Sequence, residues 1–138
     1  MSDPAPEPFI EHAIDRDQKL VRTKLVGPVT VDQIEAYMRR VDADPEYDLT
    51  FDAIIDIRLF TGSLDHEGLR RLALTIRSYP GRAGARRAVL VADDLQFGLM
   101  RMLEAFTSLA PVIYRAFRVE ATAMAWLAER HRPSGPET

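Results

Sequence analysis

Three short apolar segments rich in β-branched residues constrain the fold of this chain more than any other feature. They span residues 51–57, 87–92 and 112–117, and amphipathic stretches separate them. The apolar centres of these segments are typical of strands that are buried on both faces of a sheet. Because neighbouring parallel strands need a long crossover, usually a helix, this alternation predicts an α/β sheet that is largely parallel.

Four segments have the apolar spacing of helices. The first opens with a capping-box pattern at Thr30, the second begins near Asp65 and is expected to end at residues 79–81, and Asp93 or Asp94 is expected to cap the third. The residues expected to face the sheet are Val31, Ile34, Tyr37, Met38 and Val41 in the first helix, Leu69, Leu72, Ala73 and Ile76 in the second, Leu99, Met100, Leu103 and Phe106 in the third, and Ala121, Met124, Ala125, Trp126 and Ala128 in a fourth over residues 120–129.

A hairpin precedes these elements. Residues 10–14 and 19–26 alternate weakly between apolar and polar side chains, with a polar turn between them. A loop is expected at residues 60–63, before the second helix. The predicted order is β-β-α-β-α-β-α-β-α, an α/β layered fold whose mostly parallel sheet has one antiparallel edge strand and helices packed on it.

The chain has the size and apolar content of one domain. Of its 138 residues, 46% are hydrophobic and 28% are charged, enough for a single core. We expect this domain over residues 9–131, with disordered tails at 1–8 and 132–138, which are rich in proline and other turn formers. No apolar run is long enough to span a membrane, and no export signal opens the sequence, so a cytoplasmic location is expected.

The absence of cysteine excludes a disulfide scaffold, a thiolate zinc site and a cysteine nucleophile. No phosphate-binding loop, metalloprotease or serine-hydrolase motif is present, and no cofactor or metal is expected. Neither is nucleic acid a predicted partner, because the pI is near 5.6 and no aromatic residues lie among the arginines.

Charge is distributed unevenly along the chain. Residues 1–67 carry 15 acidic and 7 basic residues, whereas residues 68–138 carry 6 acidic and 11 basic residues. Such an asymmetry could steer a partner or drive self-association. The alternative, which we favour, is that the two sets form solvated faces that fold against each other.

Three stretches of sequence resemble one known fold family. They are Ile54-Ile-Asp-Ile-Arg-Leu-Phe-Thr-Gly62, the helix entry Asp65-His-Glu-Gly-Leu69, and Phe117-Arg-Val-Glu-Ala121 with Ala125-Trp-Leu127. Together with the element order, they resemble the SpoIIAA-like branch of the STAS superfamily, the anti-sigma-factor antagonist fold that is related to SEC14-like domains. The resemblance covers nearly the whole folded unit, and it implies a fold rather than an activity.

The phosphorylation loop of that family is altered here. The family loop reads Asp-Ser-Ser-Gly-Leu, and its first serine is phosphorylated to switch binding. His66 stands at that serine position, so the usual switch is missing. Thr61 and Ser63 are nearby hydroxyls that could replace it, although Thr61 also suits a turn and Ser63 a helix cap.

The leading interpretation is therefore a non-catalytic STAS-like regulatory domain that binds a protein partner or a second copy of itself, for example as a homodimer. The resemblance places the contact surface on the loop and on the helix that follows it. Its candidate residues are Thr61, Ser63, Asp65, His66, Glu67, Gly68, Arg70 and Arg71.

Two other functions stay open. SEC14 kinship implies a small apolar ligand or lipid, with Phe97, Met100, Leu103 and Phe106 as the candidate pocket, although such a stripe is more often core. An acid–base or metal-assisted enzyme would instead use His66 with Asp93 or Asp94. Capping of helix starts is the simpler role for these aspartates.

Overall fold

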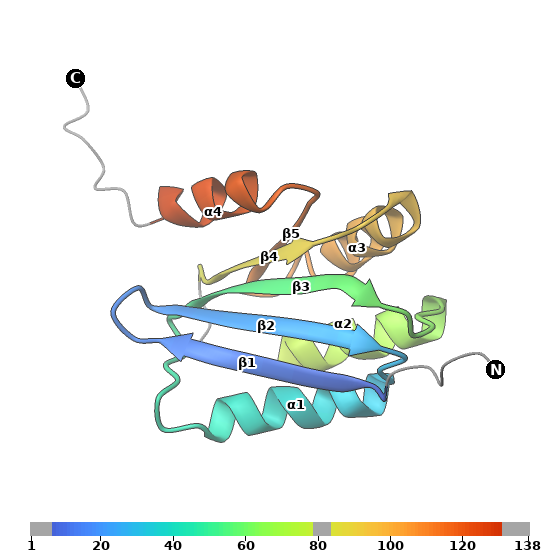
Figure 1. The fold of residues 1–138 in the computed structure, drawn as a ribbon, viewed down its shortest axis with the longest axis horizontal. Helices are drawn as coiled ribbons and strands as arrows, with labels where there is room; N and C mark the ends of the chain where they lie inside the picture. The colour runs from blue at the N-terminus through green and yellow to red at the C-terminus, as the bar shows by residue number, and fades with distance from the viewer. Residues whose placement is uncertain (1–6, 79–83, 131–138) are drawn as a thin grey trace.

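The computed structural model describes residues 7–78 and 84–130, and within them the elements follow the predicted order (Figure 1). They are β1 (Phe9–Asp15), β2 (Leu20–Gly27), α1 (Val31–Ala43), β3 (Asp52–Phe60), α2 (His66–Ser78), β4 (Arg86–Leu90), α3 (Asp94–Phe106), β5 (Ile113–Phe117) and α4 (Glu120–Glu129). The expected helix end at residues 79–81 and most of the two expected tails lie outside the described residues. No helix in the described part is both long and apolar enough to cross a membrane.

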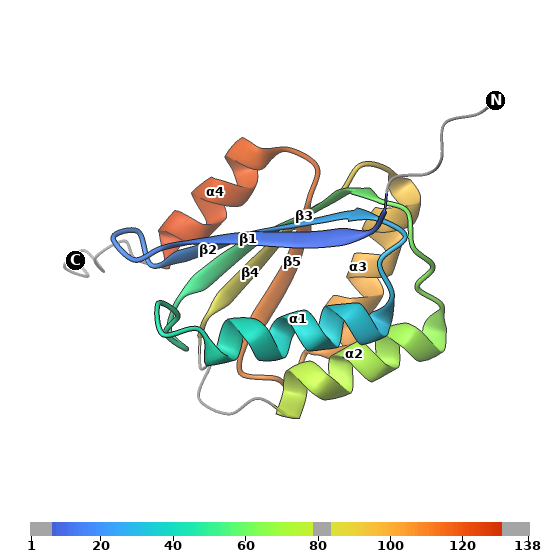
Figure 2. The same cartoon turned by 60° about the horizontal axis from the view of Figure 1, so that its bottom comes forward.

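The strands stand in the sheet in the order in which they occur in the chain, β1-β2-β3-β4-β5. The β1–β2 pair is antiparallel and the other pairs are parallel, which confirms the predicted mixed sheet. Since right-handed crossovers that advance in one direction put their helices on one face, this order accounts for the position of α1, α2 and α3 on the same side. Figure 2 shows α1 and α2 below the sheet and α4 above it, and the core residues of α3 pack on the same side as α1 and α2.

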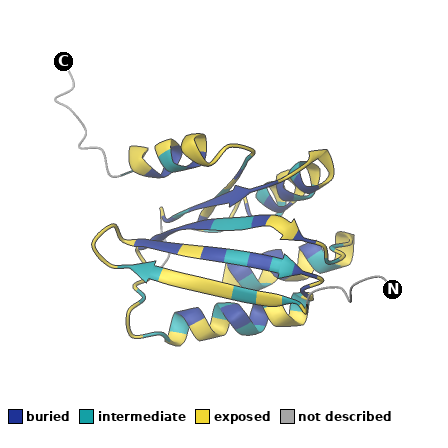
Figure 3. Cartoon of the chain, in the orientation of Figure 1, coloured by how far each residue is buried: buried dark blue, intermediate teal, exposed yellow. Residues whose placement is uncertain are grey.

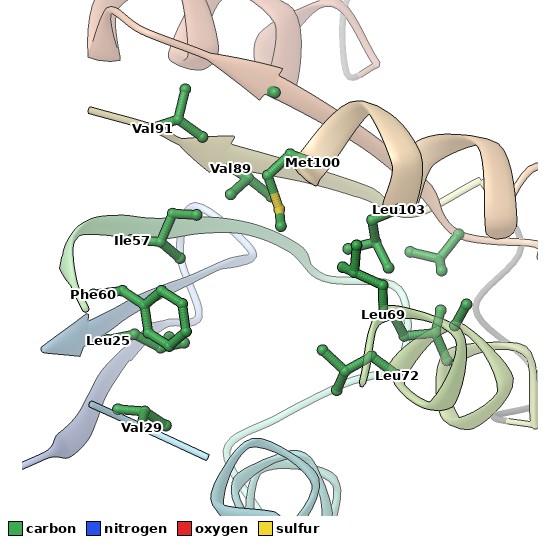
Figure 4. Packing of buried hydrophobic residues seen from close by; sticks show 14 of the residues in the cluster. Leu25, Val29, Ile57, Phe60, Leu69, Leu72, Val89, Val91, Met100 and Leu103 are labelled. Atoms are coloured by element: carbon green, nitrogen blue, oxygen red, sulfur yellow. The ribbon is translucent and has the colours of Figure 1, made fainter. Parts of the chain in front are cut away.

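The main core lies between the sheet and the three crossover helices (Figure 4). Leu69, Leu72, Ala73 and Ile76 of α2 are buried in it as predicted, and α3 contributes Met100 and Leu103. The capping box at Thr30 is also confirmed, because its side chain accepts from the Gln33 amide and Gln33 returns a bond to the Thr30 amide. The apolar stripe of α2 and the capping box of α1, both visible in the local sequence, therefore account for much of the packing on this face of the sheet.

Within the described ranges, α4 is the helix that covers the opposite face, and here the predicted contact residues are partly wrong. Ala121, Ala125 and Ala128 are exposed, whereas Ala123, Trp126 and Leu127 are buried. The two large side chains set the buried stripe of this helix, since they remove far more apolar area from water than alanines do. Trp126 and Leu127 pack with Leu20, Ile54 and Leu90 of the sheet. Figure 3 shows that β1, at the edge of the sheet, stays largely exposed.

Strand β3 is longer than expected. Phe60, predicted to open a loop, is its last residue and is buried in the main core. A register shift in the β2–β3 pairing allows this, because Lys24 pairs with Asp56 but Val26 pairs with Leu59. The shift gives β3 one more residue than β2 between these pairs. The alternation of apolar and polar residues in the sequence does not reveal such an extra residue.

A buried carboxylate joins the amino ends of two strands to the last helix. Asp52, the first residue of β3, is only 2% exposed. One of its oxygens accepts from the Arg86 amide of β4 (2.8 Å) and from the guanidinium of Arg130, which follows α4. Arg130 also donates to the Thr50 carbonyl (2.9 Å). The end of α4 is thereby fixed to the sheet by charge as well as by apolar packing.

We expect Asp52→Asn to lower the free energy of unfolding by about 2 kcal/mol, because the neutral amide keeps an acceptor but loses the charged partner of Arg130. Urea unfolding at neutral pH measures this difference. Asp17→Asn, a change of the same kind at an exposed turn position, serves as the control and should shift stability by no more than about 0.5 kcal/mol. Equal stability of the Asp52 variant and the native protein would contradict the role assigned to this carboxylate.

Candidate functional site at the carboxyl edge of the sheet

The carboxyl ends of β2, β3, β4 and β5 meet at one edge of the sheet because these strands are parallel. The segments that leave this edge lead into the four helices, and the loop of residues 61–65 joins β3 to α2. Open α/β sheets place their binding sites at this edge. All eight candidate contact residues predicted from the sequence lie in this loop or in the first two turns of α2.

The start of the loop is held close to the β2 end. The Thr61 amide donates to the Gly27 carbonyl (3.0 Å). At Gly62 a side chain has no room, since a Cβ there would lie 2.3 Å from the Val29 carbonyl oxygen and 2.7 Å from the Phe60 ring. The loop conformation therefore requires glycine at this position.

Asp65 caps α2. Its carboxylate accepts from the Gly68 amide (2.8 Å), and its carbonyl accepts from the Leu69 amide (3.0 Å). The cap is thus the aspartate, and the expectation that Ser63 could serve as the cap is wrong. Ser63 and Thr61 are both exposed.

His66 does not contact the aspartates proposed for acid–base chemistry. Its ring packs edge-on against Phe106, with the ring centroids 5.3 Å apart. Asp93 accepts from the Gln96 amide (2.8 Å) as the cap of α3, and Asp94 pairs with Arg118. In residues 7–78 and 84–130, no hydrogen bond or ion pair joins His66 to either aspartate, and no three potential metal ligands cluster.

Gln96 is a structural residue of this edge that sequence reasoning missed. Its buried side-chain amide donates to the carbonyls of Ile57 (2.8 Å) and Phe60 (3.2 Å), and its oxygen accepts from the Ala92 amide (2.8 Å). It therefore links the end of β3 to the β4–α3 connection. A polar residue three positions after an N-cap is ordinary in sequence, so no pattern marked it.

Two arginines at the edge are held in fixed positions. Arg58 donates to Asp56 through its amide, Nε and Nη2, at 2.9, 3.0 and 2.9 Å. Burial acts to raise the pKa of the Asp56 carboxyl, but the bonds from Arg58 outweigh it and hold that pKa below its ordinary value. Arg118 pairs with Asp94, and its guanidinium also lies 5.1 Å from the centre of the Phe97 ring.

Large apolar side chains are exposed beside these arginines. Leu95, in the first turn of α3, is 74% exposed, and Leu59 of β3 and Val119 at the N-cap of α4 are each 56% exposed. These residues belong to segments at the ends of three neighbouring strands, β3, β4 and β5. Sequence reasoning missed these three residues. For Leu59 the cause is the register shift in β3, on which its exposure depends.

The two arginines predicted as contact residues have different surroundings. Arg71 pairs with Asp32 and Glu35 of α1, which connects the basic second half of the chain to its acidic first half. Arg70 is exposed, and it makes no ion pair with the described residues. The ion pairs of Arg71 with Asp32 and Glu35 favour the interpretation in which the acidic first half and the basic second half of the chain pack against each other.

The alternative ligand pocket is only partly assembled. Met100 and Leu103 line an apolar cavity of about 100 Å³ between the sheet and the crossover helices. Phe97 and Phe106 are half-buried and pack against the core without lining this cavity. Pockets for drug-sized ligands have volumes of roughly 300–1,000 Å³, so this cavity is too small for a lipid chain.

Comparison with known proteins supports the fold. The chain is similar to an uncharacterised protein of the DUF3478 family with a SpoIIAA-like fold, from Shewanella loihica, whose crystal structure matches with a TM-score of 0.63. Sequence identity is 22%, over 92% of this chain and 98% of that chain. A comparison with protein-family models gives no match, and neither does a comparison with curated proteins. The expected SpoIIAA-like fold is confirmed.

Arg70→Glu and Arg71→Glu should differ in their effect on stability. We expect Arg70→Glu to leave the thermal midpoint nearly unchanged, because Arg70 has no acidic partner among the described residues. Arg71→Glu should lower it, since the new carboxylate would face Asp32 and Glu35. Differential scanning fluorimetry compares the two variants, and an equal effect of both would contradict the assignment of Arg71 to the α1–α2 contact.

Glu104 of α3 gives a prediction about pH. Burial raises the pKa of its carboxyl above the ordinary value, and the nearby charges of Arg101 and Arg115 only partly oppose this effect. The ionised form is therefore less stable in the folded than in the unfolded protein. Glu104→Gln should raise the free energy of unfolding at pH 7, and this advantage should shrink as the pH falls through the folded-state pKa.

Urea unfolding of both proteins at pH 7 and at pH 4 measures this change. The native protein regains its relative stability in acid because protonation removes the buried charge. A variant that is less stable than the native protein at pH 7 would show that the Glu104 charge has a favourable partner instead.

Proposed function

We propose that this protein is a non-catalytic binding domain that acts in the cytoplasm and contacts another protein through the carboxyl edge of its sheet. The carboxyl-edge surface consists of Leu59, Ser63, His66, Arg70, Leu95 and Val119, together with the two fixed arginines Arg58 and Arg118. One observation carries the proposal: three large apolar side chains are exposed at this edge, next to arginines that are already held in place.

Exposed apolar side chains and fixed arginines are suited to protein recognition. Burial of an exposed leucine at an interface gives about 2 kcal/mol of hydrophobic free energy. Arg58 and Arg118 are oriented by Asp56 and Asp94, so they lose little side-chain freedom when a partner binds. Arginine is also enriched among the interface residues that contribute most to the affinity of protein–protein complexes.

Regulation at the usual switch position forms no part of this proposal, because His66 carries no phosphorylatable hydroxyl. The hydroxyls of Thr61 and Ser63 are exposed before the start of α2. A phosphoryl group on Ser63 would place negative charge near the first amides of this helix, where anions are stabilised.

The experiment is a quantitative affinity capture from extracts of the native host, followed by direct binding measurements with the purified captured protein. We expect Leu95→Asp to weaken binding at least tenfold, because it places a charge in the centre of the proposed contact. Sedimentation velocity on the purified protein tests the case in which the partner is a second copy.

Leu109→Asp is the matched control. Leu109 is 83% exposed and lies in the connection after α3, at the opposite end of that helix from Leu95. It should bind like the native protein. Equal weakening by both substitutions, or no effect of Leu95→Asp, would contradict the carboxyl-edge surface.

A further inference from the structure

Arg87 is a buried cation on the sheet face that the crossover helices cover. It is 4% exposed, and it lies near the amino end of β4. The strand register places it in one row across the sheet with Val21, Ala53 and Tyr114. This row is far along the strands from the carboxyl edge, so Arg87 does not belong to the proposed partner surface.

The described partners of the Arg87 guanidinium are all neutral. Its Nη1 donates to the carbonyls of Phe51 (2.8 Å) and Arg86 (3.3 Å), and its Nη2 donates to the Tyr47 hydroxyl (3.1 Å). Within the described ranges it pairs with no carboxylate, and its Nε–H makes no hydrogen bond. A buried charge is normally matched by an opposite charge. The guanidinium therefore has both charge and donors left for an anion.

A small cavity lies beside this side chain. It has a volume of about 70 Å³, and its lining includes Arg87, Ala53 and Thr23 from the sheet and Tyr37 and Val41 from α1. Ala53 leaves this space, because it is the smallest side chain in a row that otherwise holds valine, arginine and tyrosine. Burial raises the pKa of the Tyr37 hydroxyl to about 12.

The cavity next to Arg87 adjoins the apolar cavity of about 100 Å³ described above. The two share Thr23, Tyr37, Met38, Ile55 and Tyr114 among their lining residues. One end of the combined space thus offers the Arg87 guanidinium, beside the hydroxyls of Thr23 and Tyr37, which are hydrogen-bonded to each other. The other end is apolar. For comparison, an apolar cavity of about 150 Å³ in another protein binds benzene.

We propose that these adjoining cavities bind a small monocarboxylic acid, with its carboxylate on Arg87 and its apolar body against Met38 and Ile55. This ligand site is separate from the proposed partner-binding function. The guanidinium matches a planar carboxylate through parallel N–H groups. A phosphate dianion fits less well, because the site has one described cation and its other end is apolar.

Titration calorimetry with sodium benzoate tests the proposal, with benzyl alcohol as the neutral probe of similar shape and inorganic phosphate as the competing anion. We expect benzoate to bind at least tenfold more tightly than benzyl alcohol or phosphate. Arg87→Gln should weaken benzoate binding at least tenfold and leave benzyl alcohol binding nearly unchanged.

A second variant keeps the test decisive if Arg87→Gln does not fold. Ala53→Leu fills the cavity while it keeps the charge, and it should abolish benzoate binding. Arg115→Gln is the matched control, since Arg115 lies over the Trp126 ring on the opposite face of the sheet. It should bind benzoate like the native protein.

Several results would overturn the proposal. They are the absence of benzoate binding to the native protein, equal binding of phosphate and benzoate, and benzoate binding that survives Ala53→Leu. Amide chemical shifts that change at the carboxyl edge instead of at residues near Arg87 would also place the ligand elsewhere.

Discussion

The order of the strands in the sheet determines most of what surrounds it. Because β2 to β5 stand side by side in chain order and run parallel, the three helices between them cover a single face. The fourth helix follows the last strand and covers part of the other face. The same constraint gathers the carboxyl ends of four strands at one edge, where the loop of residues 61–65 and the exposed Leu95 and Val119 lie. The partner surface that we propose is thus a consequence of topology.

Two buried charged side chains near the amino ends of the strands, Asp52 and Arg87, differ in the charge of their partners. Asp52 accepts from a backbone amide and pairs with Arg130, so its charge is matched within the protein. Arg87 donates only to neutral groups among the described residues. A buried charge with an oppositely charged partner, such as Asp52, holds parts of the fold together. A buried charge that has only neutral partners among the described residues and lies beside a cavity can bind an anion, because the anion supplies the opposite charge.

Local signals made much of this fold predictable from sequence. The capping box at Thr30, the apolar stripe of α2 and the element order all depend on residues close together in the chain. The predictions that failed depend on contacts between residues far apart in the chain. One is the register shift that extends β3 to Phe60. The other is the face of α4 that packs on the sheet, which Trp126 and Leu127 determine. The contact surface expected from the sequence and the surface proposed from the structure lie at the same end of the sheet, but they share only Ser63, His66 and Arg70. In the sequence, Arg87 is one of 11 basic residues in the second half of the chain, and only the pairing of β4 with β3 and β5 places it beside Ala53 and Tyr114.

The cavities also bear on stability. Empty space in a core costs contacts, and a larger side chain than Ala53 would remove part of that cost. A ligand that fills the same space stabilises the folded state by mass action, by about 2.7 kcal/mol at a concentration one hundred times its dissociation constant. For a domain of ordinary marginal stability, this is a substantial fraction of the total. A fold in which Arg87 has only neutral partners among the described residues, beside a gap at Ala53, would therefore gain more stability from a small carboxylate than a fold with a filled core would.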